Sequence, residues 1–178
     1  VFVATAQRLK SAPRQNVSIE IQVALPLFVQ VFMTMGDRYL AANVAAIRAL
    51  VVAPDRMQAD EFKILAKVQK DVSWLNPGHE DNYYIAFAIL PQYGELEAAQ
   101  TILARATHAR HFDYQPAFFY GFNQWHYKRD PAGAAAWMRE AAKHLPDPNQ
   151  QLTMQNLAAR WVDRAQDTEL AIRVVEAL

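Results

Sequence analysis

Histidine provides the clearest candidate for chemistry in this chain of 178 residues. His108 and His111 stand three positions apart, and Asp113 follows closely. Two imidazole nitrogens and a carboxylate are ligands that zinc accepts. Such a pair also arises by chance, and His111 at a helix end would simply complement the negative end of the helix dipole. We therefore predict no metal and no cofactor.

The acidic residues that stand close together lie at expected helix starts, not beside a base or a nucleophile. Two such pairs are Glu80 with Asp81 and Glu95 with Glu97, where the positive end of a helix dipole accounts for them. The chain has no cysteine, which excludes thiolate nucleophiles, disulfides and cysteine zinc sites. Phosphate-loop, dinucleotide-fingerprint, GxSxG and HExxH motifs are also missing from the sequence. We predict that the protein is not an enzyme.

The composition indicates one folded helical domain over residues 1–178. Hydrophobic residues make up 52% and charged residues 20%, which is typical of globular chains. Alanine is abundant and glycine numbers five, and both features favour helices over sheets. The formal net charge is zero, so the basic footprint expected of a nucleic-acid-binding protein is missing.

Apolar residues recur at helical spacing along the whole chain, and proline, glycine and aspartate separate the segments. We expect helices over residues 1–12, 18–35, 37–52, 57–75, 79–90, 96–111, 117–128, 132–145, 150–165 and 169–178.

Two apolar segments near the N-terminus carry specific expectations. Residues 21–35 form the most apolar stretch, but a bilayer crossing needs about 20 apolar residues, so we predict a buried core helix. In the following helix the larger apolar side chains share one face, which we predict to be its buried face. They are Tyr39, Leu40, Val44, Ile47, Leu50 and Val51.

A repeat is visible in the second half of the chain. Residues 83–106 and 118–142 each read as an aromatic-rich helix, a short turn and an alanine-rich helix. Small residues at the contact point of each second helix fall at Ala99, Ala134 and Ala171, giving intervals of 35 and 37. A period near 34 with two helices per unit is typical of tetratricopeptide repeats.

The individual residues resemble that family as well. In the first copy the residues that match are Tyr83, Ala86, Leu90, Gly94, Ala99, Leu103 and Ala106. The resemblance implies an all-α, right-handed superhelical solenoid of antiparallel helix hairpins. The units would span about 21–54, 82–111, 117–146 and 151–178, with an irregular helix at 57–75. Pro91 and His111 depart from the pattern.

A narrower resemblance rests on GDRYLAAN, WLNPGHEDNYYIA and FFYGFN. This combination is similar to uncharacterised bacterial tetratricopeptide-like proteins tethered by an N-terminal membrane helix. It implies a tether outside this chain and a periplasmic domain, with the cytoplasm as the alternative. Because the chain begins at Val1, we expect it to be a fragment or a processed form.

The family resemblance implies a protein-interaction domain, an adaptor, scaffold or assembly factor, that binds a peptide or a helix in a groove lined by the first helix of each unit. Asparagine and arginine there would hold a peptide's backbone or carboxylate, although Asn123 also fits a buried position. The candidate groove residues are Tyr84, Gln92, Phe122, Asn123, Trp125, His126, Asn156, Arg160 and Arg164.

Two other functions remain open at this point. An aromatic pocket around Tyr84, Phe122, Trp125 and His126 could serve a small ligand or an enzyme. Alternatively, the stacking surfaces of the units could mediate self-association.

Overall fold

The computed structural model describes residues 24–51, 57 and 59–176. In these ranges it contains eight α-helices and one short 3₁₀-helix, and no strand. The helices are α3 (Leu27–Met33), α4 (Arg38–Val51), α5 (Ala59–Leu75), α6 (Glu80–Ile89), η2 (Leu90–Tyr93), α7 (Leu96–Ala109), α8 (Gln115–His126), α9 (Pro131–Lys143) and α10 (Pro148–Glu176). The chain is therefore all-α. The helix expected over residues 1–12 lies outside the described residues.

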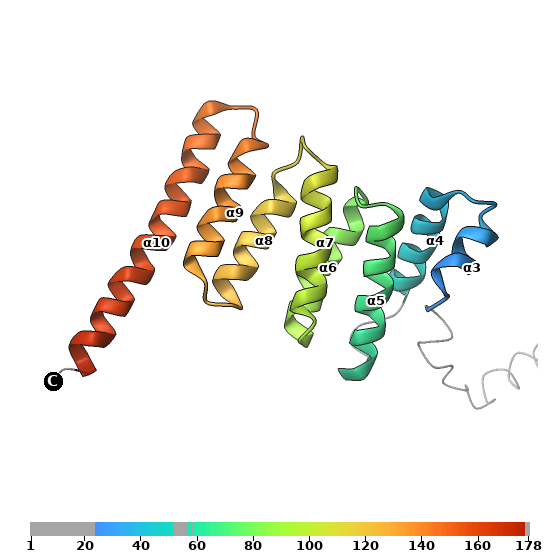
Figure 1. Cartoon of the computed structure of the whole chain (residues 1–178), viewed down its shortest axis with the longest axis horizontal. Helices are drawn as coiled ribbons and strands as arrows, with labels where there is room; N and C mark the ends of the chain where they lie inside the picture. The colour runs from blue at the N-terminus through green and yellow to red at the C-terminus, as the bar shows by residue number, and fades with distance from the viewer. Residues whose placement is uncertain (1–23, 52–56, 58, 177–178) are drawn as a thin grey trace, which may run out of the picture.

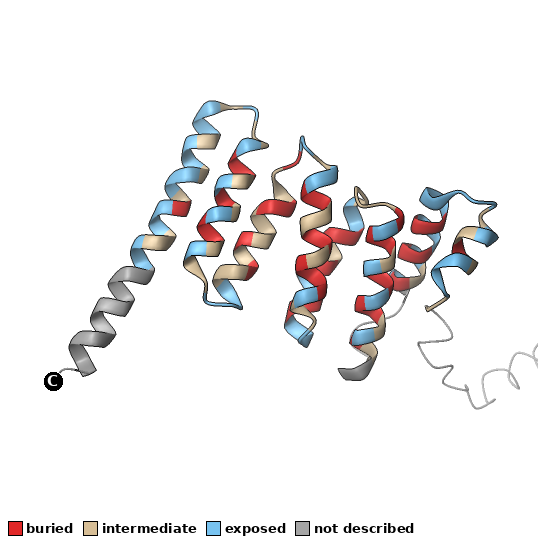
Figure 2. Cartoon of the chain, in the orientation of Figure 1, coloured by how far each residue is buried: buried red, intermediate tan, exposed pale blue. Residues whose placement is uncertain are grey.

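Successive helices pack as antiparallel neighbours in one elongated row, with α3 and α4 at one end and α10 at the other (Figure 1). Buried residues line the facing sides of the helices, whereas the outer sides and both ends are largely exposed (Figure 2). The main core lies among α5, α6 and α7, where Phe62, Tyr83, Leu90 and Leu103 are buried. An array of this kind has a narrow core that runs along its length.

Local sequence signals account for several helix boundaries. Asp37 accepts hydrogen bonds from the backbone N–H groups of Tyr39 and Leu40 at 2.9 and 3.0 Å and so caps the N-terminus of α4. Asp130 caps α9 in the same way, through the N–H of Gly133 at 2.8 Å. Gly94 adopts a φ of +87° after η2, a conformation that glycine adopts without strain.

The expectation of a buried core helix at 21–35 is wrong in the described part of that stretch. Only residues 27–33 are helical, Gln30 is the one buried residue among them, and Phe32 is 83% exposed. Leu25 is not helical because Pro26 follows it and restricts its backbone.

The predicted buried face of α4 is also wrong. The side that packs on α5 is made of alanines, whereas the larger apolar residues Tyr39, Leu40, Val44, Ile47 and Leu50 lie on the opposite, exposed side. The side chain of Val51 lies outside the described part of the structure. Small side chains let the two helix backbones approach closely, and this close packing decides which face is buried. The buried residues are Ala41, Ala42, Ala45, Ala46 and Ala49.

A third correction concerns the C-terminal part. A turn was expected at residues 166–168, but α10 continues unbroken through them (Figure 1). Gln166, Asp167 and Thr168 include neither glycine nor proline, so each costs a helix only about 0.7 kcal/mol or less. The interval from Ala134 to Ala171 therefore does not mark a further helix hairpin after α8 and α9.

Candidate binding surface

The main candidate surface is a row of aromatic side chains on α6, α8 and α10. We call it the aromatic row and define it as Tyr84, Phe87, Phe119, Phe122, Trp125, His126 and Trp161. His126 is exposed and the other six side chains are half-buried. The rings therefore pack against one another and still present edges and faces to solvent.

Ring stacking joins α6 to α8 at one end of the row. Phe87 and Phe119 stack with their ring centroids 4.0 Å apart. Tyr84 meets Phe119 edge-on at 5.4 Å, and Phe87 meets Phe122 edge-on at 5.8 Å. These two edge-on pairs join residues 35 positions apart, the interval that the repeat predicts.

The row continues from α8 to α10. Trp125 stacks on Trp161 at 5.2 Å, and Phe122 stacks on His126 at 5.4 Å. Trp125 and Trp161 are 36 positions apart, close to the interval of 35 between the edge-on pairs of α6 and α8.

An open hollow of about 310 Å³ lies on the same side of α10 as Trp161. Met154 and Leu157 line it and precede Trp161 by seven and four residues, which is one stripe of a helix. The other lining residues are Tyr114, Leu145, Gln150 and Thr153. An open hollow lined in part by apolar side chains is suited to an inserted side chain.

Close packing behind α8 orients the row. Gly121 faces α9, and a Cβ added there would lie 3.0 Å from the carbonyl oxygen of Ala134 and 3.3 Å from Cβ of Trp137. Tyr120 stacks on Trp137 at 3.8 Å on the same side. These contacts fix the rotation of α8 about its axis and so direct Phe122 and Trp125 away from α9.

The structure brings some of the predicted groove residues together and separates others. Tyr84, Phe122, Trp125 and His126 belong to the aromatic row. Four more are exposed outside the aromatic row, on η2 and α10: Gln92, Asn156, Arg160 and Arg164. Gln92, in η2, donates to the carbonyl oxygen of Ala88 in α6 at 2.6 Å.

Asn123 does not reach the surface. Its side chain is fully buried, and neither amide atom has a hydrogen-bond partner. A buried amide without partners costs about 1–3 kcal/mol. The sequence left Asn123 either in the groove or in a buried position. The groove position is wrong, because α8 turns this side chain inward.

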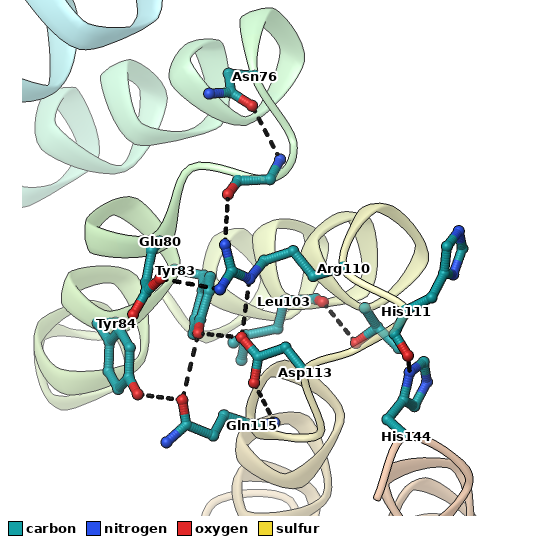
Figure 3. Close-up of polar contacts among 12 residues, drawn as sticks. Asn76, Glu80, Tyr83, Tyr84, Leu103, Arg110, His111, Asp113, Gln115 and His144 are labelled. Carbon is teal, nitrogen blue, oxygen red and sulfur yellow. Dashed lines mark hydrogen bonds and ion pairs between the residues drawn. The ribbon is translucent and has the colours of Figure 1, made fainter. Parts of the chain in front are cut away.

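A polar network behind the row ties α6 and α7 to the start of α8 (Figure 3). Its centre is Asp113, in the loop between α7 and α8. Tyr83 Oη donates to Asp113 Oδ2 at 2.6 Å, Arg110 Nε donates to the same oxygen at 2.8 Å, and the N–H of Gln115 donates to Oδ1 at 3.0 Å. Arg110 also contacts Glu80 at 2.9 Å. The network sets where α8 begins.

Protonation states follow from these contacts. Burial by itself would raise the pKa of Asp113, but the hydrogen bonds from Tyr83, Gln115 and Arg110 outweigh it and hold the pKa below its ordinary value. Burial, and then the bond to Asp113, raises the pKa of Tyr83 well above its ordinary value. At neutral pH the network therefore holds an ionised Asp113 and a neutral Tyr83.

The zinc ligand set considered from the sequence is not assembled. Asp113 is bound by Tyr83 and Arg110, whereas His108 and His111 are exposed. In the part of the chain that the structure describes, no three His, Asp or Glu side chains gather closely enough to hold a metal ion. The carbonyl oxygen of His111 contacts His144 Nδ1 at 2.8 Å, which links this loop to the end of α9 (Figure 3).

Sequence reasoning missed Phe87, Trp161 and the Asp113 network. Phe87 follows Tyr84 by three residues and Trp161 follows Met154 by seven, so helical spacing could have placed both on these faces. Asp113 stands two residues before Gln115 and three before Pro116, which marks a helix start, so the sequence could have placed it at the N-terminus of α8. Its partners Tyr83 and Arg110 come from other helices and carry no such local signal.

Comparisons with known proteins add no assignment. No family model, curated protein or solved structure matches the chain. None of the helices in the described ranges has the length and hydropathy that a bilayer crossing requires.

Proposed function

We propose that this chain is a non-enzymatic protein-interaction domain that binds an extended peptide or a helix along the aromatic row. The observation that carries the proposal is the set of ring contacts that joins α6 to α8 and α8 to α10. Aromatic side chains contribute large contact areas at interfaces and lose little conformational entropy. We further propose that the helix row is a tetratricopeptide-like solenoid, on the support of the 35- and 36-residue offsets between stacked rings.

The surroundings of the row support a polypeptide as the bound partner. The hollow beside Met154 and Leu157 offers a recess for one apolar side chain. Exposed polar groups flank the rings, among them Gln92 on η2 and Arg160 on α10. Apolar anchors with a polar margin are the usual composition of a protein interface.

The rival function, a small-ligand or catalytic pocket at the same rings, has less support. Phe122 lies against Phe87 and His126, and Trp125 lies against Trp161. Each of these rings therefore already contacts another ring, which leaves less ring surface free for a stacked ligand. In the part of the chain that the structure describes, no carboxylate or hydroxyl group contacts His126 to make it a general base.

The test uses three variants of this chain as baits to capture partners from native extracts. Calorimetry then measures how tightly each bait binds the captured protein. The baits are the wild type, a row variant with Trp125→Ala and Arg160→Ala, and a control with Trp74→Ala and Arg139→Ala. The control removes the same residue types from exposed positions on α5 and α9. All three must show the same helicity by circular dichroism.

A protein retained by the wild type and the control, and lost by the row variant, is the expected result. We expect the row variant to weaken binding by about 2–4 kcal/mol, which is the usual effect of removing an aromatic or arginine hot spot. Equal binding by all three baits would show that the partner does not use the row.

A further inference from the structure

The α3–α4 end of the helix row exposes an unusually large apolar surface. We call it the end face and define it as Phe28, Phe32, Met33, Met35, Tyr39, Leu40, Val44, Ile47 and Leu50. Met35 is 99% exposed, Phe32 83% and Ile47 60%. Judged from these fractions the side chains offer roughly 1,000 Å² of surface, whereas the largest apolar patch on a monomer is about 300–600 Å².

Two features place these residues on one hairpin. On α4, residues 39, 40, 43, 44, 47 and 50 are exposed and together span less than half of the helix circumference. Opposite them, the alanine side of α4 packs on α5. Because Val31 of α3 packs on that same α4–α5 core, α3 is held beside α4 as part of the same end.

We propose that the end face is the interface of a symmetric homodimer in which two copies join end to end through α3 and α4. A standard interface buries about 800 Å² on each partner, which the end face can supply. The end face has the composition of a contact between packed units, as if another copy completed it.

The shape of the surface fits a second copy. An open hollow of about 770 Å³ lies at α3 and the turn that follows it. Its lining residues are Phe28, Val31, Phe32, Met33, Met35 and Gly36. On α4, Leu40, Val44 and Ile47 are exposed at helical spacing and can form a ridge. In a two-fold interface each copy contributes both parts, so the ridge of one copy can enter the hollow of the other.

The charges fit a second copy better than a bilayer. The charged residues next to the end face in α4 are Asp37, Arg38 and Arg48, which is not the cluster of about four to eight Lys and Arg residues that favours anionic lipid. Adjacent Asp37 and Arg38 can instead pair with their counterparts across a two-fold axis. The chain's formal net charge is zero, so long-range repulsion does not oppose self-association.

The test is sedimentation velocity and light scattering of the whole 178-residue chain over a wide range of micromolar concentrations. The variant is Ile47→Glu, and the matched control is Leu152→Glu on α10. Ile47 is 60% and Leu152 57% exposed, so both changes place a charge at equally accessible apolar positions. Circular dichroism establishes that both variants fold.

We expect dimers for the wild type and for Leu152→Glu. Ile47→Glu should raise the dimer dissociation constant at least about 100-fold, because a two-fold axis buries the new charge twice. A monomeric wild type, or an Ile47→Glu variant that dimerises normally, would overturn the proposal. Wild type that is monomeric but sediments with phosphatidylcholine vesicles, while Ile47→Glu does not, would overturn it in favour of a bilayer.

This inference is independent of the proposed function. The end face lies on α3 and α4, whereas the aromatic row lies on α6, α8 and α10, further along the helix row (Figure 1). The row variant Trp125→Ala, Arg160→Ala should therefore dimerise like the wild type. Failure of one proposal leaves the other standing.

Discussion

Replacement of Asp113 by asparagine tests whether the polar network sets the start of α8. All three groups that contact the carboxylate are donors: Tyr83 Oη, Arg110 Nε and the N–H of Gln115. An asparagine offers one acceptor oxygen and one donor NH₂ group. At least one of these donors must then face the NH₂ group, whichever way the amide turns.

The expected loss of stability follows from the number of donors that lose their acceptor. Hydrogen bonds to charged groups contribute about 1.5–3 kcal/mol each, and an unsatisfied buried donor costs about 1–3 kcal/mol. We expect Asp113→Asn to lower the free energy of unfolding by about 3 kcal/mol. For a chain of this size, that corresponds to a fall in Tm of about 6–12 °C.

The effect should depend on pH in one direction. The pKa of Asp113 lies below its ordinary value in the folded state, so the folded state favours the ionised form. Its contribution to stability is fully present above the unfolded pKa, about 3.9, and is lost as the pH falls through the lower folded pKa. The difference between wild type and Asp113→Asn should therefore be largest at neutral pH and shrink in acid.

The assay is urea unfolding followed by circular dichroism at neutral and acidic pH. Asp163→Asn is the control, because Asp163 is exposed on α10 and surface changes usually stay within about 0.5 kcal/mol. An Asp113→Asn variant as stable as the control at neutral pH would refute the reasoning. So would a loss of stability that does not change with pH.

Substitutions at three further positions test the packing around α8 and α9. Gly121→Ala should lower the free energy of unfolding by about 1–3 kcal/mol, and Gly121→Val by more, since the new Cβ meets a carbonyl oxygen at 3.0 Å; thermal melts of the pair measure the trend, and two equally stable variants would contradict it. Asp130→Ala removes the cap of α9 and should cost about 1 kcal/mol in urea unfolding, with an unchanged midpoint as the contrary result. Asn123→Leu should leave stability unchanged or raise it by about 1–2 kcal/mol, because neither amide atom has a partner; a clear loss by calorimetry would show that the amide is satisfied in solution.

The sequence by itself determined the features that depend on neighbouring residues. Asp37 and Asp130 cap helices because their side chains reach N–H groups two or three positions ahead. The burial of Phe62, Leu65, Val68, Val72 and Leu75 follows from their helical spacing. The all-helical class follows from the same two signals, repeated along the chain.

Only the tertiary structure decided which apolar face of α4 is buried. Both faces of this helix are apolar, one made of alanines and the other including Leu40 and Ile47, so periodicity cannot choose between them. Close contact with α5 selects the alanines, and the larger side chains remain outside. The Asp113 network and the stacking of Trp125 on Trp161 could not be predicted from the sequence for a related reason. Their members lie on different helices, and their proximity depends on how those helices pack.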